Sequence, residues 1–273
     1  MVDGKKLKKI LTKIFINHGL SQNHANISSN ALINAELVGA HTHGLARLKM
    51  YCDRINKKVI NPKAKIKIKK ISQSISQVDA NSSIGFVAAD IGIKEAIKNA
   101  KKTGIGLVGI KNSGHYGLSG YYAEQAVKKN LIVFCFTNAP PAIAPHGSKK
   151  KLFGTNPICF GSPTTSKIPF ILDTSVSEIN RGKIRVAAKT GKKIPVGVAL
   201  DKFGKPTTDA KKTGIGMVAV KNSGHYGLSG YYAEQAVKKN LITMIYTNAP
   251  PAVAPHGALK SLFGTNPICF GTP

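Results

Sequence analysis

The sequence lacks the long apolar run that a membrane-spanning helix requires. No uninterrupted apolar stretch approaches the roughly 18–20 residues that cross a bilayer. Residues 1–15 also lack the apolar core and the small-residue cleavage site of a secretion signal. Instead, Leu7, Leu11 and Ile14 share one face of a predicted amphipathic helix. We therefore expect a protein that is neither inserted in a membrane nor exported.

Cysteine is scarce as well. The sequence has four cysteines, none of them in a closely spaced pair: Cys52, Cys135, Cys159 and Cys269. Structural zinc sites use closely spaced pairs, and small secreted folds use a dense framework of cysteines. We therefore predict no structural metal and a reducing compartment, the cytoplasm.

Acidic residues, arginine and tryptophan are also few or absent. The sequence contains 12 Asp and Glu against 40 Lys and Arg, which gives a net charge of +28 and invites a nucleic-acid interpretation. Arginine is the preferred residue for phosphate and base edges, but only four of the 40 are arginines: Arg47, Arg54, Arg181 and Arg185. The lysines are not interleaved with stacking aromatics. We interpret the charge as a lysine-rich composition and keep a polyanion-binding protein as the alternative.

The most prominent feature that is present is a repeat. Residues 100–163 return as residues 210–273, and 52 of the 64 aligned positions are identical. Two copies separated by unrelated sequence do not form the short, regular period of a solenoid or propeller. We divide the chain into an N-terminal helical segment (1–60), a cofactor and substrate domain (61–209) and a duplicate of 100–163 (210–273).

Periodicity and turn residues predict an alternation of helices and strands. The predicted helices cover residues 4–20, 22–39 with Ser21 or Asn23 as cap, a segment from 45 onward, 85–102, 121–130 and 176–189. The predicted strands cover a hairpin within 63–80, then 104–110, a buried strand over 131–138, and 169–175.

One short motif is a false lead. Gly104–Gly109 matches the dinucleotide fingerprint G-x-G-x-x-G, which requires a strand before it and a helix after it. Here the predicted order is the reverse. We interpret the match as a coincidence.

The first candidate site lies in the segment HTHGLARLKMY. A helix start flanked by His43 and Arg47 suits a carboxylate, because free amides, the helix dipole and a guanidinium act together. Arg47 and Tyr51 are four residues apart and share a helix face. His41 and His43 could also bind a metal, although no further ligand follows at useful spacing. An ordinary surface or capping role for these histidines stays open.

The second candidate lies in the segment SGHYGLSG. Its glycines allow the backbone to approach a ligand closely, and Ser119 is a plausible cap for the helix that follows. His115 comes directly after a predicted strand, where α/β proteins commonly bind ligands. The alternative is a turn histidine that only fills space.

Two further segments end predicted strands with polar residues. Thr137, Asn138 and Ala139 precede a pair of prolines and could form a stiff loop. Asp173 is followed by two hydroxyl residues, Thr174 and Ser175, and could cap the next helix or bind a ribose hydroxyl.

Together these segments resemble the malate/L-lactate dehydrogenase family of non-Rossmann, nicotinamide-dependent oxidoreductases. That family includes ureidoglycolate and sulfolactate dehydrogenases and diketogulonate and piperideine-carboxylate reductases. The resemblance covers residues 1–209 in the family's order, through the segments HTHGLARLKMY, KNSGHYG, TNAPPAIAPHG, LFGTNPICFGSP, ILDTS, RGKI and IPVGVALDKFGKPTTD.

The resemblance implies an enzyme that exchanges a hydride between NAD or NADP and a small 2-hydroxy or 2-keto acid. It implies His43 and His115 as acid/base candidates and Arg47 as the group that binds the substrate carboxylate. It further implies an α/β fold with a mixed, largely antiparallel sheet, flanking helices and a homodimeric assembly. The implied cofactor contacts are Thr137, Asn138, Ala139, Asp173, Thr174 and Ser175.

The chain departs from the family after the segment GKPTTD. There the family continues into a long stretch that completes the cofactor pocket and the dimer, whereas this chain continues with the second copy. A non-catalytic, oligomer-forming relative is therefore a further alternative. If the chain is an enzyme, we expect His115 to act and its counterpart His225 not to act.

Overall fold

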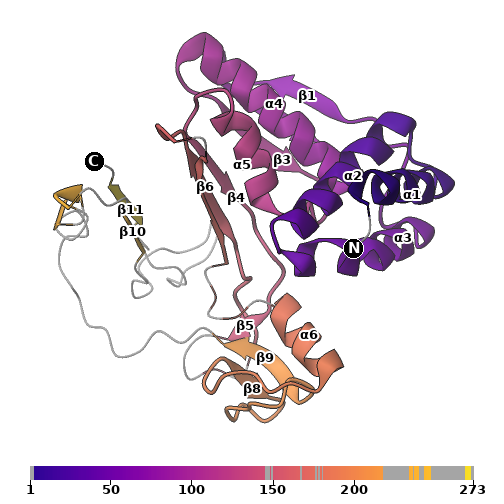
Figure 1. Cartoon of the computed structure of the whole chain (residues 1–273), viewed down its shortest axis with the longest axis vertical. Coiled ribbons are helices and arrows are strands. Elements are labelled where there is room, and N and C mark those ends of the chain that lie inside the picture. Colours follow the sequence, from indigo (N-terminus) through magenta and orange to yellow (C-terminus); the bar gives the residue numbers. More distant parts are fainter. Residues whose placement is uncertain are drawn as a thin grey trace, which may run out of the picture. The chain divides into compact units, whose positions relative to one another are not determined.

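The chain divides into two compact units, Met1–Ala219 and Val220–Pro273. The computed structural model (Figure 1) describes residues 3–144, 148, 150–166, 168–175, 177, 179, 181–217, 234–235, 237–239, 243–246 and 268–271. His225 lies outside the described residues.

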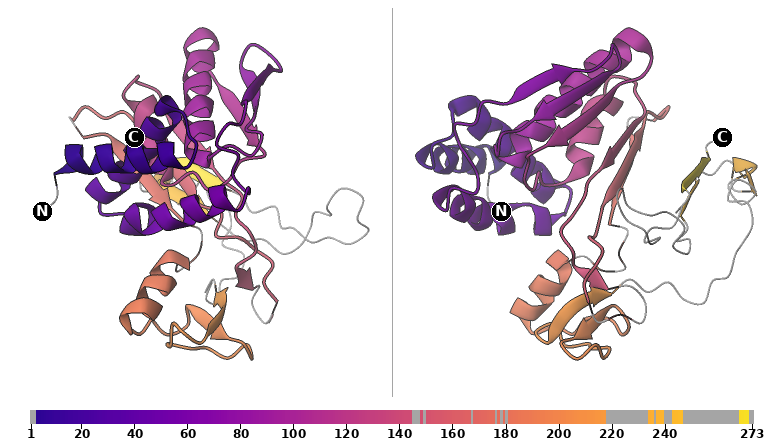
Figure 2. Two further views of the ribbon diagram at one scale, coloured as in Figure 1. Left: turned by 90° about the vertical axis from the view of Figure 1, so that its right-hand side faces the viewer. Right: turned by 180° about the vertical axis from the view of Figure 1, so that it is seen from behind.

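The N-terminal helices form as the sequence predicts and cluster together (Figure 2). Ser21 caps its helix by accepting the amide of His24 at 3.3 Å, as expected of a serine cap. The third helix begins three residues later than predicted, because residues 45–47 form a 3₁₀ turn. The elements are α1 (Gly4–Asn17), α2 (Gln22–Leu37), η1 (His41–His43), η2 (Leu45–Arg47) and α3 (Leu48–Asn56).

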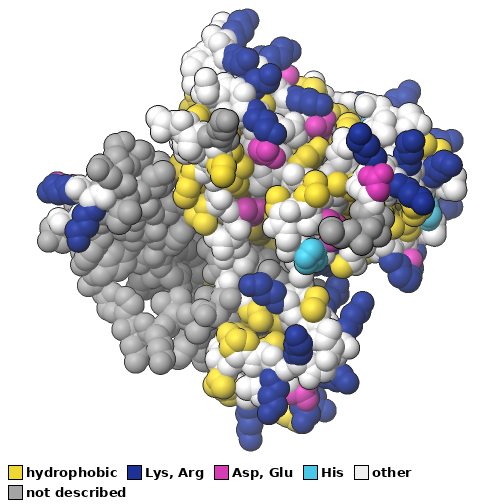
Figure 3. Space-filling model, in the orientation of Figure 1, with side chains coloured by type: hydrophobic (Ala, Val, Ile, Leu, Met, Phe, Trp, Pro, Cys, Tyr) yellow, Lys and Arg dark blue, Asp and Glu magenta, His cyan; other side chains and the backbone are white. Residues whose placement is uncertain are grey.

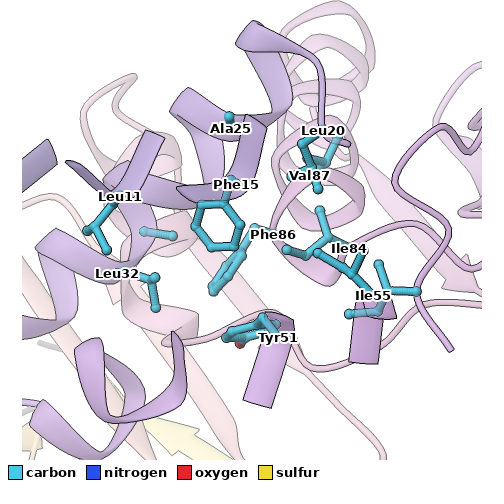
Figure 4. Packing of buried hydrophobic residues seen from close by; sticks show 12 residues of the cluster. Leu11, Phe15, Leu20, Ala25, Leu32, Tyr51, Ile55, Ile84, Phe86 and Val87 are labelled. Carbon is cyan, nitrogen blue, oxygen red and sulfur yellow. The ribbon is translucent and has the colours of Figure 1, made fainter. Parts of the chain in front are cut away.

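A hydrophobic core joins these helices to α4 (Gly85–Thr103). Phe15, Tyr51 and Phe86 are fully buried in it, and the rings of Tyr51 and Phe86 lie 4.6 Å apart (Figure 4). This packing fixes α3 against the start of α4, which is where the functional side chains converge.

A first small sheet packs on α4 in the order β1-β2-β3. The predicted hairpin is β1 (Lys67–Lys70) and β2 (Ile75–Asp79), and β3 (Leu107–Lys111) adds in parallel. Strand β3 begins at Leu107 and not at residue 104 as predicted, because Gly104 ends α4 in the left-handed conformation with φ 84°. The G-x-G-x-x-G match therefore runs from a helix end into a strand, the reverse of a dinucleotide fingerprint.

A second sheet carries the predicted cofactor segments. Its antiparallel order is β4-β6-β7, and α5 (Ser119–Val127) packs on one face. The strand predicted over 131–138 is present, but the prediction that it is buried is wrong, because the opposite face leaves Phe134 and Phe136 exposed by 43% and 63%. One covered face is the ordinary state of an antiparallel sheet. The strands are β4 (Val133–Phe136), β6 (Ile158–Ser162) and β7 (Phe170–Thr174).

A third sheet draws one strand from the start of the second copy. Strand β9 pairs in parallel with β5 and antiparallel with β8, and α6 (Arg181–Thr190) lies between β5 and β8 in the chain. The sheets are thus mixed and largely antiparallel, which confirms the predicted fold class. Within the described residues, no helix combines the length and apolar character needed to span a bilayer. The strands are β5 (Ile143–Ala144), β8 (Ala199–Asp201) and β9 (Thr213–Met217).

The second unit contains an antiparallel pair, β10 (Thr243–Tyr246) and β11 (Ile268–Gly271). Ile245 pairs with Cys269, and the equivalent residues of the first copy, Cys135 and Cys159, pair in the same way. The second copy therefore repeats the register of β4 and β6.

Candidate active site

His115 is held by a tyrosine from another part of the chain. The Tyr51 hydroxyl on α3 lies 2.6 Å from Nδ1 of His115, and the Gly117 amide donates to the same nitrogen at 3.2 Å. His115 belongs to the loop between β3 and α5. The loop and α3 therefore meet at this imidazole, although 64 residues separate the two side chains in the sequence.

Two glycines allow this close approach. A Cβ on Gly85, at the start of α4, would lie 2.4 Å from the carbonyl oxygen of His115. Gly117 has φ +86°, and a Cβ there would lie 2.7 Å from the ring of Phe86. Side chains at either position would push the loop away from the core, so the glycines fix the place of the histidine.

His43 completes an imidazole pair with His115. Their rings are stacked with centroids 5.7 Å apart and planes inclined by 18°. The Thr42 hydroxyl lies 3.1 Å from Nδ1 of His43, and Arg47 donates from Nε to the Thr42 carbonyl at 2.7 Å. The structure therefore brings His43, Arg47 and His115 together, as the sequence predicts.

Burial and nearby cations keep both imidazoles neutral. Burial, and then the charge of Arg47, lower the pKa of His43. Burial, with His43, Arg47 and Arg54, lowers the pKa of His115 to about 3. Burial raises the pKa of Tyr51 above its ordinary value, so the phenol keeps its proton. The site at neutral pH therefore holds two uncharged imidazoles beside cationic arginines.

The predicted carboxylate corner already contains a carboxylate. Glu36 of α2 accepts the Leu45 amide at 2.6 Å, and its other oxygen lies 2.6 Å from Nδ1 of His41. Gly44 leaves room for it, since a Cβ there would lie 2.1 Å from the Glu36 oxygen. The expectation that the free amides of this helix start bind substrate is therefore wrong for Leu45. Arg47 is then the remaining group of this corner that is predicted to bind a substrate carboxylate.

The predicted cofactor residues lie at one end of the β4-β6-β7 sheet. Phe136, Ile158 and Thr174 are cross-strand neighbours, so the segments that follow β4 and β7 lie at the same edge. An open pocket of about 380 Å³ is present there. Its lining residues are Phe136, Thr137, Asn138, Asn156, Pro157 and Ile158.

Asn156 shapes this pocket and was missed in the sequence. Its Oδ1 accepts the amide of Ala139 at 2.9 Å, which ties the segment after β4 to the segment before β6. Of the predicted residues, Thr137 and Asn138 line the pocket, whereas the Ala139 amide is used internally. In the sequence Asn156 is only a turn-forming residue before Pro157, so no local signal showed that its side chain would reach Ala139.

Asp173 faces α5 rather than the helix that follows it. Its Oδ2 accepts the Gly120 amide at 2.7 Å. Burial raises its pKa, and the amides of Gly120 and Ser119 oppose that shift. The prediction that Ser119 caps α5 is wrong, because the Ser119 hydroxyl lies 2.8 Å from the Tyr116 hydroxyl instead. Asp173 takes the capping role and ties β7 to the start of α5, which directly follows the His115 loop.

The two hydroxyls after Asp173 make short-range contacts. Thr174 donates to the Ser175 carbonyl at 3.2 Å, and Ser175 donates to the Ser177 carbonyl at 3.2 Å. Both residues remain at the sheet edge that carries the pocket.

No metal centre is found in the described part of the chain. No group of three or more His, Cys, Asp or Glu there could hold a metal ion. His41 pairs with Glu36, and His43 stacks on His115.

Tyr51 and Arg54 were not assigned to the site from the sequence, although their spacing from Arg47 was a signal for both. Arg47, Tyr51 and Arg54 follow one another by four and three residues, which places all three on one side of a helix. In the structure the charges of Arg47 and Arg54 both act on His115, and Tyr51 contacts it directly. Glu36 carried no such signal, because it lies in a different helix.

Comparison with protein families gives a match over most of the chain. The sequence model of a family described as malate/L-lactate dehydrogenase matches residues 2–213 and, separately, 209–273. The malate/(S)-sulfolactate dehydrogenase of Methanothermus fervidus is 36% identical over 227 residues, 83% of this chain and 66% of that protein. The L-sulfolactate dehydrogenase of Methanocaldococcus jannaschii is 38% identical over 205 residues, 75% of this chain and 59% of that protein.

Solved structures give the same result. Malate dehydrogenase from Entamoeba histolytica superposes with a TM-score of 0.74 and 34% identity, over 77% of this chain and 58% of that one. Sulfolactate dehydrogenase from Methanocaldococcus jannaschii superposes with a TM-score of 0.73 and 34% identity, over 86% of this chain and 69% of that one. The chain spans less than two thirds of the length of the two curated relatives.

Proposed function

Because the chain belongs to the malate/L-lactate dehydrogenase family, we propose that it exchanges a hydride between NAD or NADP and C2 of a small 2-hydroxy or 2-keto acid. The observation that carries this proposal is the cluster of His43, His115 and Arg47. Relatives with more than a third of their aligned residues identical are named as malate and sulfolactate dehydrogenases. A further relative, from Chromohalobacter salexigens, is named as an NADP-dependent (2R)-3-sulfolactate dehydrogenase.

The chemistry follows from the charges of the site. A carboxylate next to the reacting carbon pairs with the guanidinium of Arg47, which orients the C2 oxygen toward the imidazoles. The hydroxyl proton must leave as C2 is oxidised, and a neutral imidazole can accept it. The lowered pKa values of His43 and His115 keep such an acceptor available at neutral pH.

The sheet-edge pocket fits part of a dinucleotide. Its volume of about 380 Å³ lies within the usual range for small-molecule sites. Thr137, Asn138 and Asn156 provide polar groups, and the exposed ring of Phe136 provides an apolar surface. A nicotinamide cofactor bound there supplies the hydride acceptor or donor, which no side chain can provide.

The second copy bears on the proposed activity of the chain. It repeats residues 100–163 and matches the family separately, so it does not add the cofactor contacts that the family places further along its sequence. It also has no second HTHGLARLKMY segment beside it, so we propose that only the first copy takes part in catalysis. We also propose a homodimer in the cytoplasm, a compartment that agrees with free thiols at Cys52, Cys135 and Cys159.

Binding of dinucleotide is the first test. We expect NADH or NADPH to change fluorescence on titration, and malate, lactate, sulfolactate or ureidoglycolate to reduce the oxidised cofactor. Asn138→Ala should weaken binding by roughly 2- to 10-fold, the value of one hydrogen bond. Asn248→Ala, the same change in the second copy, serves as the matched control and should have no effect. A chain that binds neither dinucleotide contradicts the proposal and favours a non-catalytic, oligomer-forming relative.

The alternative of a polyanion-binding protein has one supporting observation, the net charge of +28. On the face shown in Figure 3, the Lys and Arg side chains are spread over many elements rather than gathered in one patch. Binding to nucleic acid with a steep salt dependence, and no binding of NADH, would favour that alternative.

A further inference from the structure

The hydrogen bonds to His115 determine which of its nitrogens carries the proton. A backbone amide can only donate, so the Gly117 amide at 3.2 Å requires a lone pair on Nδ1 of His115. The Tyr51 hydroxyl approaches the same nitrogen at 2.6 Å and must therefore donate as well. In a neutral imidazole with Nδ1 unprotonated, the proton is on Nε2.

Tyr51 is well placed to enforce this arrangement. Its side chain is fully buried, and its ring packs 4.6 Å from the ring of Phe86 in the helical core. The hydroxyl therefore cannot move away without disturbing that core. The Gly117 amide belongs to the same loop as His115 and moves with it, so Tyr51 is the donor that belongs to a separate element.

We propose that Tyr51 is a positioning residue that holds His115 as the Nε2–H tautomer and thereby gives the two histidines different roles. His115 donates a hydrogen bond from Nε2 to the C2 oxygen of the substrate, and His43 exchanges the proton. This division rests on the proposed function. The tautomer itself does not depend on it.

The proton balance is complete with these groups. During oxidation, the electron pair of the substrate C2–H bond leaves as hydride to the oxidised cofactor, and the hydroxyl O–H bond breaks. Its proton passes to the unprotonated nitrogen of His43, and the C2–O bond becomes a carbonyl. His115 keeps its own proton throughout and stabilises the charge that develops on the oxygen. His43, which is partly exposed, then releases the proton to water.

The test is the tautomer of His115, measured by long-range ¹H–¹⁵N correlation on the full chain with ¹⁵N-labelled histidine. His115→Asn assigns the signal by its loss. We expect an unprotonated Nδ1 and a protonated Nε2 in the unmodified chain at neutral pH. A protonated Nδ1 there overturns the proposal without any variant, so the test holds even if a variant fails to fold.

Tyr51→Phe keeps the ring and removes the hydroxyl. We expect the Nδ1 and Nε2 shifts of His115 to move toward those of a tautomer mixture. We also expect kcat to fall by about 10- to 100-fold, as is typical when an orienting partner of a functional histidine is removed, with KM little changed. Unchanged His115 shifts in a folded Tyr51→Phe protein overturn the proposal.

Tyr122→Phe is the matched control. Tyr122 is also buried, and its hydroxyl donates to the Tyr116 carbonyl at 2.8 Å. Its loss should lower stability in the same way but leave the His115 shifts unchanged. Equal movement of the His115 shifts in both variants overturns the assignment to Tyr51. The tautomer is read without turnover, so an inactive chain with the expected signal refutes the proposed function and leaves the role of Tyr51 intact.

Discussion

Seven residues with one sequence have two structures in this chain. Residues 100–106 and 210–216 both read AKKTGIG. In the first copy they complete the last turn of α4 and reverse direction at Gly104, whose amide donates to the Ala100 carbonyl at 2.8 Å. In the second copy they form a turn and then enter strand β9.

The residues that come before each copy explain the difference. Helix α4 starts at Gly85, so it already has several turns when the chain reaches residue 100, and each further residue adds one hydrogen bond. The second copy is preceded by strand β8 instead, and Leu200 pairs there with Ile215. A helix must nucleate at a cost, whereas an antiparallel neighbour offers its hydrogen bonds directly.

Where the copies pair within themselves, they agree. Strands β10 and β11 repeat the register of β4 and β6, although Cys135 is replaced by Ile245. The ion pair of Glu234 with Lys238 measures 2.7 Å, as does that of Glu124 with Lys128. Strand pairing within each copy therefore depends on the sequence of that copy, whereas the structure of its first residues depends on the segment that precedes them.

The largest expected difference between the copies is in activity. His115→Asn should lower kcat by about 10²- to 10⁴-fold, the range for loss of an acid/base or polarising group. His225→Asn should leave kcat unchanged, because the chain has only one HTHGLARLKMY segment to supply Arg47 and Tyr51. Steady-state kinetics on both purified variants checks this. Equal losses would show that the second copy builds a site of its own.

A smaller effect should distinguish Gly106 from Gly216. A Cβ on Gly106 would lie 2.1 Å from the Ala96 carbonyl oxygen, so Gly106→Ala should lower the free energy of unfolding by about 1–3 kcal/mol. Gly216 lies in β9 and pairs with Ala199. Because glycine weakens a strand interior relative to alanine, Gly216→Ala should raise the free energy of unfolding by about 0.5–1 kcal/mol. Urea unfolding measures both. Losses of the same size would contradict the different structures of the two segments.

The smallest effect tests a cap that lies outside the repeat. Asp173→Ala leaves the Gly120 amide without its carboxylate partner and should cost about 0.5–2 kcal/mol. Asp173→Asn keeps an acceptor oxygen and removes the charge that burial disfavours. Burial raises the pKa of Asp173, so the folded chain favours the protonated carboxyl. The stability that Asp173 contributes relative to asparagine is therefore fully present below the unfolded pKa of about 3.9.

That effect is lost as the pH rises through the folded pKa, so unfolding of the unmodified chain and the Asn variant should be compared at several pH values. A gain of the unmodified chain over Asp173→Asn with rising pH would show that the carboxylate is stabilised in place. In that case the stability of α5 would depend on the negative charge of Asp173, and not only on its acceptor oxygen.

Much of the fold could be predicted from local patterns. The cap at Ser21, the hairpin of β1 and β2 and the coincidental G-x-G-x-x-G match all follow from residues within a few positions of one another. The predicted family and fold class are confirmed. The exposed face of β4 was missed because a run of apolar residues does not show how many faces are covered.

The site was predictable only in its parts. A helix start, a glycine-rich loop and the family resemblance singled out Arg47 and the two histidines, but nothing local showed that Tyr51 would reach His115. Likewise, the two helix starts predicted to be free or capped by serine are occupied by Glu36 and Asp173, which come from other elements. A long-range carboxylate can replace a local cap because any oxygen at hydrogen-bond distance satisfies the same amide.

The family, the order of helices and strands, and the register shared by the paired strands of the two copies follow from the amino-acid sequence. The two conformations of AKKTGIG, the partners of the helix starts and the proton position on His115 follow from packing between distant segments. The two sets of features differ in how far apart in the sequence the interacting groups lie. Backbone pairing and caps within a segment are set by neighbours in the sequence, whereas these three outcomes depend on groups that meet only after packing.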